Sequence, residues 1–323
     1  EGLKALTSTD LAVDVVSGTS AGGLNGVFLA AALAYGLPES AVRSMRDIWL
    51  NVGSLTDLFR PPGDPEPRSL LQGENAFLPP VQKVLRDFMA EGKLPVRDVS
   101  LGLTTTLIKP EVRQHTDDFG DDMAQPNHRG RFRFDFAGGR RPDFQPHHLA
   151  RAARSSASFP GAFEASLVKE VPEDTIDFHT PRWVFDGGLL NNQPLDLALE
   201  SMAERRASYE VRRVVAFVVP DPVELERPAD NDELAPSLGE VLAATVSIPM
   251  QQSIHDDLER LRSTNRRIEQ QILSRRLVRL WDEDLEAVAA QLQELYLKVH
   301  SSYGAMYALR LMPESWPAST RQM

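Results

Sequence analysis

The segment Gly18-Thr19-Ser20-Ala21-Gly22 is where residue types and spacing in this sequence could do chemistry. The G-x-S-x-G spacing surrounds a serine with small residues, which let the backbone turn sharply and present the hydroxyl as a nucleophile. A helix that follows would aim its first N–H groups at an oxygen on which charge develops. A glycine-rich turn without chemistry, or a phosphate-binding loop, would show the same short pattern. We predict Ser20 as nucleophile, the Ala21 N–H as oxyanion donor, and Gly18, Gly22 and Gly23 as supports of the turn.

A serine nucleophile needs a base, and two kinds of residue compete for that role. Asp186 follows the predicted strand 183–185 and precedes two glycines, at a strand end where open α/β sheets bind ligands. The same residues would also suit an ordinary Asp-Gly turn. The seven histidines are His115, His128, His147, His148, His179, His255 and His300. The chain order of α/β-hydrolases would combine Ser20 and Asp186 with His255 or His300, so the residues alone leave the base open.

The elements that must position these residues follow from hydrophobic patterning. β-Branched or alternating runs predict strands, and apolar residues three and four apart predict helices. The predicted strands are 12–16, 99–108, 183–185 and 211–219, and the predicted helices are 24–36, 81–89, 148–154 and 194–206. Of these, 211–219 is the clearest buried strand, and the polar stretch 114–139 is expected to be an irregular excursion or a hairpin. Strands that alternate with helices predict an α/β fold with a mostly parallel sheet covered on both faces.

The composition changes after Pro220. Residues 221–236 are acidic and contain proline, as is typical of a linker, and helical spacing follows over about 254–272 and 284–311. We therefore predict a catalytic domain over 1–235 and an α-helical extension over 236–323, with the two helices forming a hairpin.

Charge and cysteine content exclude several functions. The 323 residues include 35 Lys and Arg against 46 Asp and Glu, a net charge of −11, so sequence-independent binding to nucleic acid is not expected. The same balance opposes attraction of the whole surface to an anionic membrane but leaves room for a local basic patch. The absence of cysteine excludes disulfides and thiol nucleophiles, and a cytoplasmic location is the simpler expectation. No run approaches the roughly 20 apolar residues of a membrane-spanning helix.

Two weaker signals predict no further site. The aspartates Asp117, Asp118, Asp121 and Asp122 lack the alternating spacing of a calcium-binding EF-hand loop, so a solvated loop is expected there. The run Gly138-Gly139-Arg140-Arg141 is expected to be a surface turn. We expect no metal and no cofactor, and the sequence does not determine the oligomeric state.

Three segments in order resemble the patatin-like phospholipases. They are Ser17-Gly18-Thr19-Ser20-Ala21-Gly22-Gly23, the run Ala-Arg-Ser-Ser-Ala-Ser-Phe-Pro-Gly-Ala-Phe over 153–163, and Asp186-Gly187-Gly188 with Asn192-Gln193-Pro194. The resemblance covers about Leu11 to Pro220 and extends to long bacterial patatin-related proteins that carry a C-terminal extension. It implies a patatin-like sheet flanked by helices.

The resemblance also implies a mechanism. Ser20 would be the nucleophile and Asp186 would take its proton directly, without histidine, with Gly187, Gly188 and Asn192 supporting the base. The enzyme would cleave fatty-acyl esters of lipids, as a phospholipase A or a general lipid acyl hydrolase, through an acyl-enzyme and without metal. Its substrate would be a lipid, and a membrane surface would be a peripheral partner.

Two features depart from the family pattern. The family carries a glycine-rich loop upstream of the nucleophile, which forms most of its oxyanion hole. The 19 residues before Ser20 do not contain it, so we expect this loop and the first strand to lie upstream of Glu1. Gln193 stands where the family usually has a second asparagine, and we expect this change to be tolerated. A catalytically inactive patatin-like protein that binds partners through the helical extension is a remaining alternative.

Overall fold

The computed structural model describes residues 12–52, 55–61, 63, 68–91, 94–116, 122–205, 211–218, 237, 244, 255–279 and 293–296. The chain divides into two compact units, Glu1–Ile254 and His255–Met323, which are described separately. The predicted boundary near residue 235 stays a prediction, because residues 219–236 lie outside the described part.

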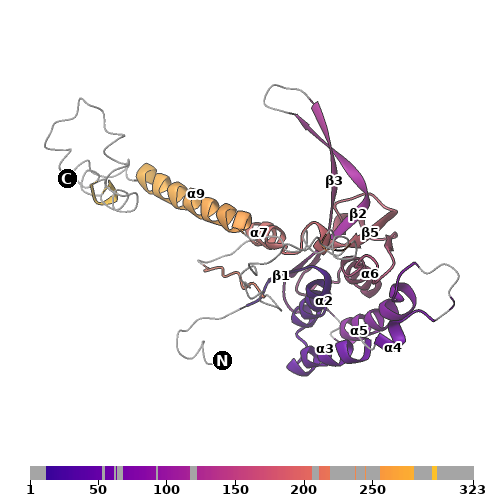
Figure 1. The fold of residues 1–323 in the computed structure, drawn as a ribbon. Helices are drawn as coiled ribbons and strands as arrows, with labels where there is room; N and C mark the ends of the chain where they lie inside the picture. The colour runs from indigo at the N-terminus through magenta and orange to yellow at the C-terminus, as the bar shows by residue number, and fades with distance from the viewer. Residues whose placement is uncertain are drawn as a thin grey trace, which may run out of the picture. The chain divides into compact units, whose positions relative to one another are not determined.

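A mixed sheet forms the centre of the first unit (Figure 1). Its strands are β1 (Val15–Gly18), β2 (Val99–Thr116), β3 (Asp122–Phe136), β4 (Ser166–Val168) and β5 (Arg182–Asp186). Strand β1 pairs with β2 in parallel, whereas β2 pairs antiparallel with β3 and β5, and β4 antiparallel with β5. The α/β fold is therefore confirmed, and the prediction of a mostly parallel sheet is wrong for the described strands. The cause is that β2 leads directly into β3 through a hairpin and not through a crossover helix.

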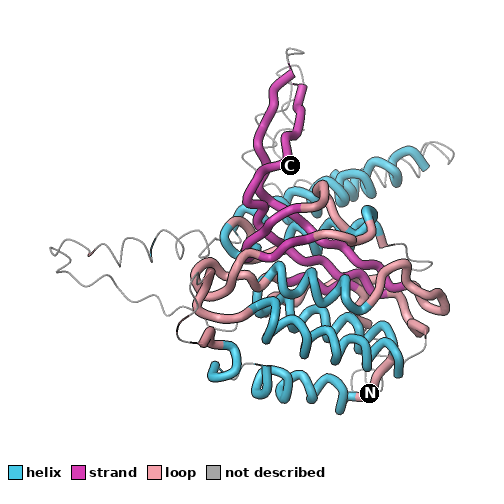
Figure 2. The backbone as a smooth tube through the Cα atoms, turned by 90° about the vertical axis from the view of Figure 1, so that its right-hand side faces the viewer, coloured by secondary structure: helices cyan, strands magenta, loops and turns pink. Residues whose placement is uncertain are grey.

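Helices cover the sheet, most of them on one face (Figure 2). Gly26 of α2 faces Val16 and Leu101 on one side of the sheet, and Leu197 of α7 faces Gly102 on the other. The helical elements of this unit are α2 (Ser20–Tyr35), α3 (Glu39–Val52), α4 (Leu55–Leu58), η1 (Gly73–Phe77), α5 (Leu78–Glu91), α6 (Pro146–Ser156), η2 (Glu173–Thr175), η3 (Gly187–Leu189) and α7 (Leu195–Glu204). These bounds confirm the four helices predicted in this unit.

The core lies between the sheet and the helices α2, α5 and α6. On β3 every second residue is a buried phenylalanine: Phe132, Phe134 and Phe136. Between them, Arg133 is half-buried and Asp135 is exposed, as the two-residue period of a strand requires. Strand β2 thus has β3 along one edge, which leaves its other edge for β1 and β5.

The segment 211–218 corrects a second prediction. These residues form no strand, and Val214 and Val218 are 73% and 82% exposed. Arg213 in this segment bonds to Asp14 and to the carbonyl of Arg205, so a polar contact holds it near the start of β1. An apolar run forms a buried strand only if a neighbouring strand is available to pair with it, and no described strand pairs with residues 211–218.

The second unit contains α9 (His255–Arg279), which confirms the helix predicted over 254–272 for the residues described. Ile268 and Ile272 of α9 are each 47% exposed. Most of the predicted helix 284–311 lies outside the described residues, and its residues 293–296 are helical. No helix in the described part of the chain is long and apolar enough to cross a membrane.

Candidate active site

Ser20 sits at a sharp turn between β1 and α2. Its backbone has φ = 55°, a left-handed conformation that costs energy in a residue other than glycine. Gly18 makes the turn possible, because a Cβ on this residue would lie 2.4 Å from the carbonyl oxygen of Gly22. Ala21, Gly22 and Gly23 form the first turn of α2, and Gly22 borders open space. The turn therefore presents the Ser20 side chain at the N-terminal end of a 16-residue helix.

The sheet brings Asp186 close to this turn. Strand β1 ends with Gly18 opposite Leu103, and β5 ends with Asp186 opposite Thr105. Because the two strands run in opposite directions along the same edge of β2, their carboxyl ends meet there. Two residues of a strand span about 7 Å, so the ends of β1 and β5 are separated by roughly that distance along β2.

The Asp186 carboxylate is fully buried and has few partners. Its Oδ1 accepts a hydrogen bond from the Gly188 N–H at 2.7 Å, and its Oδ2 makes no hydrogen bond of standard geometry within the described part. Burial raises the pKa of Asp186 to about 6, although the nearby Ser20 side chain and the Gly188 N–H partly offset that rise. A carboxylate with a raised pKa and an unpaired oxygen beside a hydroxyl can accept a proton from it.

The loop after Asp186 fits closely against β2. A Cβ on Gly187 would lie 2.3 Å from Oγ1 of Thr104, so a larger residue could not follow the carboxylate in this turn. The Asn191 carbonyl accepts hydrogen bonds from the Thr19 and Thr104 hydroxyls, at 2.9 and 3.1 Å. These bonds tie the residue before Ser20 to the loop that follows Asp186.

Asn191 therefore supports this loop through the hydrogen bonds to its carbonyl. Asn192 was the predicted support, and its role stays a prediction. The side-chain oxygen of Gln193 is buried and has no hydrogen-bond partner within the described part.

The end of α6 holds both halves of the site, a role that the sequence did not reveal. The Ser20 N–H donates to Oγ of Ser156 at 3.0 Å, and the Asp186 N–H donates to the carbonyl of Ser158 at 3.0 Å. Both serines are fully buried. They belong to the segment 153–163 that carried the family resemblance, which was a usable signal although it indicated no specific contact.

A buried arginine anchors this segment in turn. Arg154 is fully buried, donates to the Ser158 hydroxyl, and donates to the Glu164 carbonyl at 2.8 Å. The Glu164 carboxylate accepts from the Gly73 and Glu74 N–H groups, at 3.1 and 2.7 Å, and from the Ser69 hydroxyl. Burial alone would raise the pKa of Glu164, but these hydrogen bonds hold it at about 2. The result is a charged network that fixes the loop leading to Ser158.

The histidines with described side chains all have contacts elsewhere. His128 bonds to the Leu107 carbonyl, and His179 bonds to Glu111. The His147 ring contacts the His148 ring in a tilted arrangement, and His148 accepts a hydrogen bond from the Gln145 N–H. None of these four bonds to Ser20 or Asp186. The side chains of His115, His255 and His300 lie outside the described part, so the alternative with His255 or His300 is not tested.

The glycine–arginine run and the aspartate cluster can be compared with the structure only in part. Gly139 lies in an exposed turn with φ = 76°, which confirms the surface turn predicted for 138–141. Asp117, Asp118 and Asp121 lie outside the described residues. Within the part that is described, no group of three or more His, Cys, Asp or Glu side chains is arranged to hold a metal ion.

A nucleophile turn and a buried carboxylate on a mixed sheet agree with the family indicated by the motifs. The chain belongs to the patatin-like phospholipase family, whose family model matches residues 2–199. This membership confirms the resemblance and supports lipid acyl hydrolysis as the general class of activity.

A relative extends the comparison. Over 280 residues the chain is 37% identical to "Uncharacterized membrane protein Rv3479" of Mycobacterium tuberculosis (strain ATCC 25618 / H37Rv). The alignment covers 78% of this chain and 25% of the relative, so the chain spans about a quarter of that protein's length. The name describes that protein as a membrane protein, and the cytoplasmic location of the present chain stays a prediction.

Proposed function

We propose that this protein hydrolyses carboxylic esters of fatty-acyl lipids with a Ser20–Asp186 dyad. The observation that carries the proposal is the buried Asp186 carboxylate, with Oδ2 unpaired and its pKa raised to about 6, beside a serine at φ = 55°. Family membership supports the lipid substrate class. The positions of Ser20, Ala21 and Asp186 suggest the two chemical steps described next.

In the first step, Ser20 Oγ attacks the ester carbonyl while its proton moves to Asp186. The negative charge that develops on the carbonyl oxygen would be bound by the Ala21 N–H at the start of α2. The Ser20 N–H is not available for this role because it already donates to Ser156. Collapse of the tetrahedral intermediate breaks the ester bond, and the alcohol leaves with the proton that Asp186 held.

In the second step, water hydrolyses the acyl-enzyme. Asp186 removes a proton from the attacking water, and the hydroxide portion adds to the acyl carbonyl. When the second intermediate collapses, Ser20 regains a proton from Asp186 and the fatty acid leaves. Both steps use one base with a pKa near 6, which is basic enough to act on a hydroxyl and is ionised at neutral pH.

Labelling with a fluorophosphonate probe tests the nucleophile. We expect the 323-residue chain to be labelled and Ser20→Ala not to be labelled. Ser155→Ala, a change at a buried serine that bonds Ser166, is the matched control and should be labelled. Absence of Ser20-dependent labelling in a folded protein that contains the family's glycine-rich loop would contradict the proposal and favour the inactive alternative. Loss of labelling in His255→Ala or His300→Ala would favour a Ser–His–Asp triad.

A further inference from the structure

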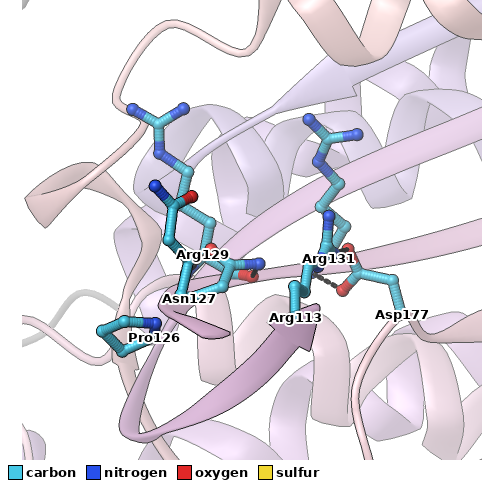
Figure 3. Close-up of a pocket in the computed structure, with 7 residues that line it drawn as sticks. Arg113, Pro126, Asn127, Arg129, Arg131 and Asp177 are labelled. Atoms are coloured by element: carbon cyan, nitrogen blue, oxygen red, sulfur yellow. Dashed lines mark hydrogen bonds and ion pairs between the residues drawn. The ribbon is translucent and has the colours of Figure 1, made fainter. Parts of the chain in front are cut away.

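The β2–β3 hairpin carries a polar cleft that the proposed dyad does not use (Figure 3). The hairpin continues beyond the last β5 pairing at Leu107 and projects from the sheet (Figure 1). The cleft has a volume of about 240 Å³. Its polar lining consists of Arg113, Gln125, Asn127, Arg129, Arg131 and Asp177. Three arginines thus gather at one site on a chain whose net charge is −11.

The three arginines differ in how far their charge is neutralised. Arg131 pairs with Asp196 and Glu200 of α7 at 2.7 and 2.8 Å, so its charge is matched. Arg113 is half-exposed and contacts Asp177 at 3.3 Å. Arg129 has no guanidinium partner among the described residues, although its backbone N–H bonds to Asn127. The cleft therefore keeps unneutralised positive charge at Arg129 and spare donors at Arg113.

The nearest strand neighbours do not remove this charge. Glu111 lies opposite Asn127 in the hairpin, but its carboxylate is bound by Arg182 and by His179. Asp177 accepts from the Arg131 N–H at 2.7 Å as well as from Arg113. An anion that entered the cleft would meet charged and neutral N–H donors and a single carboxylate, an arrangement suited to phosphate.

The register places the cleft close to the backbone of the proposed base but on the other face of the sheet, because side chains alternate and Asp186 follows Phe185. Arg129 lies opposite Thr106, and Thr106 lies opposite Phe185, the residue before Asp186. Two strand spacings amount to about 10 Å. The Thr106 hydroxyl also donates to the Asp186 carbonyl at 2.8 Å, so the same short segment of β2 supports both sites.

We propose that this cleft binds the phosphate group of an anionic lipid through Arg129 and Arg113. The identification of a lipid as the ligand rests on the proposed function, whereas the preference for a phosphate anion rests on the cleft itself. Binding here would hold the protein at an anionic lipid surface. The basic site is local, as required on a chain with excess acidic residues.

Vesicle binding tests this proposal independently of hydrolysis. Two proteins would be compared, the Ser20→Ala chain and the Ser20→Ala chain that also carries Arg113→Gln and Arg129→Gln. Each would be sedimented with vesicles of phosphatidylcholine mixed with phosphatidylglycerol, and separately with vesicles of phosphatidylcholine alone. We expect the two arginine substitutions together to weaken binding to the anionic vesicles about a hundredfold, because each removes a charged hydrogen bond that contributes about tenfold. Binding to phosphatidylcholine vesicles should not change.

Arg140→Gln is the matched control, since Arg140 is an exposed arginine of the same unit that pairs only with Asp143 among its described neighbours. Hydrolysis of soluble p-nitrophenyl butyrate by the Arg113→Gln/Arg129→Gln chain with Ser20 intact should equal that of the unaltered chain. This measurement also shows that the arginine variant folds.

The outcomes separate the two proposals. Equal binding of anionic vesicles with and without the two arginines would overturn the cleft proposal. Arginine-dependent binding of inorganic phosphate, measured by calorimetry, without an arginine-dependent preference for anionic vesicles would overturn the lipid assignment. Arginine-dependent vesicle binding in a chain that neither cleaves p-nitrophenyl butyrate nor reacts with the fluorophosphonate would support the cleft and contradict the proposed function.

Discussion

Asp186 is a fully buried carboxylate and Glu164 a largely buried one, with its side chain 11% exposed, and their surroundings shift their pKa values in opposite directions. Glu164 accepts hydrogen bonds from two backbone N–H groups, from Ser69 and from Arg60, and its pKa is about 2. Asp186 accepts one backbone N–H and has a buried oxygen without a standard hydrogen bond, and its pKa is about 6. Burial raises the pKa in both cases, but Asp186 is more deeply buried and has fewer donors, and the two differences together separate the pKa values.

The contrast indicates what each carboxylate does. Glu164 is stabilised as an anion and would accept a proton only in strong acid, so it can fix the loop that leads to Ser158. Asp186 is poorly stabilised as an anion, which costs folding free energy and suits it to the proposed role as a base for Ser20. A buried carboxylate with many donors is a structural anchor, and one with few donors is a candidate for catalysis.

The largest effect is expected when each of the two carboxylates is replaced by its neutral amide and the activities are compared. Asp186→Asn should lower kcat by about 10²–10⁴-fold, because it removes the proposed general base. Glu164→Gln should keep most of its kcat, because this carboxylate takes no part in proton transfer. Hydrolysis of p-nitrophenyl butyrate at pH 8 measures both. Equal losses of kcat in the two variants would contradict the assignment of Glu164 as a structural anchor and Asp186 as the base.

The next largest effect concerns Arg154, the buried arginine that pairs with Glu164. Arg154→Met should lower the free energy of unfolding by about 3–5 kcal/mol, because it leaves the Glu164 carbonyl and the Ser158 hydroxyl without their buried donor. It also removes one of the two arginines that pair with the Glu164 carboxylate. Urea denaturation measures this value. The exposed Arg140→Gln should stay within about 0.5 kcal/mol of the unaltered chain. A similarly small change in Arg154→Met would show that the network does not anchor the loop.

The pH dependence of stability should have opposite sign at the two carboxylates. The pKa of Asp186 is raised from 3.8 to about 6, so its stabilising contribution is present below pH 3.8 and is lost as the pH rises through 6. Asp186→Asn should therefore gain about 3 kcal/mol over the unaltered chain between pH 4 and pH 8.

The pKa of Glu164 is lowered from 4.5 to about 2, so its contribution is present above pH 4.5 and is lost toward pH 2. The advantage of the unaltered chain over Glu164→Gln should thus shrink by about 3 kcal/mol between these pH values. Chemical denaturation at a series of pH values measures both differences. Parallel pH curves for all three chains would contradict the two assigned pKa shifts.

The smallest expected effect concerns the hydrogen bond that holds the nucleophile's backbone. Ser156→Ala should lower the free energy of unfolding by about 1 kcal/mol, because the Ser20 N–H loses its acceptor. The rate of fluorophosphonate labelling should fall as well, since the turn at Ser20 is less firmly held. Ser155→Ala removes a similar buried hydroxyl bond and should lower stability alone. Equal labelling rates in the two variants would exclude a positioning role for Ser156.

Local patterning predicted much of the first unit. The G-x-S-x-G spacing predicted a turn between a strand and a helix, and the structure has such a turn at Ser20. The helices were predicted because their apolar residues recur with the helical period, which depends on neighbouring positions alone. The strand 211–219 was predicted on the same local grounds and is wrong for the residues described, because a strand also needs a partner.

The site itself was only partly predictable. The motifs pointed to Ser20 and Asp186, but no local pattern states that β1 and β5 meet end to end along β2. The same limit applies to the serines of α6, which touch the site through contacts more than 20 residues distant in the chain. The arginine cleft likewise depends on the pairing of β2 with β3.

By itself, the sequence predicted the family and the position of the turn at Ser20, and the family resemblance implied that Asp186 is the base. Only the tertiary structure decided that Asp186 is weakly stabilised and Glu164 strongly stabilised as an anion. The physical reason is that a carboxyl group's pKa depends on which donors and how much solvent surround it. Those surroundings are assembled from chain segments that are far apart in the sequence.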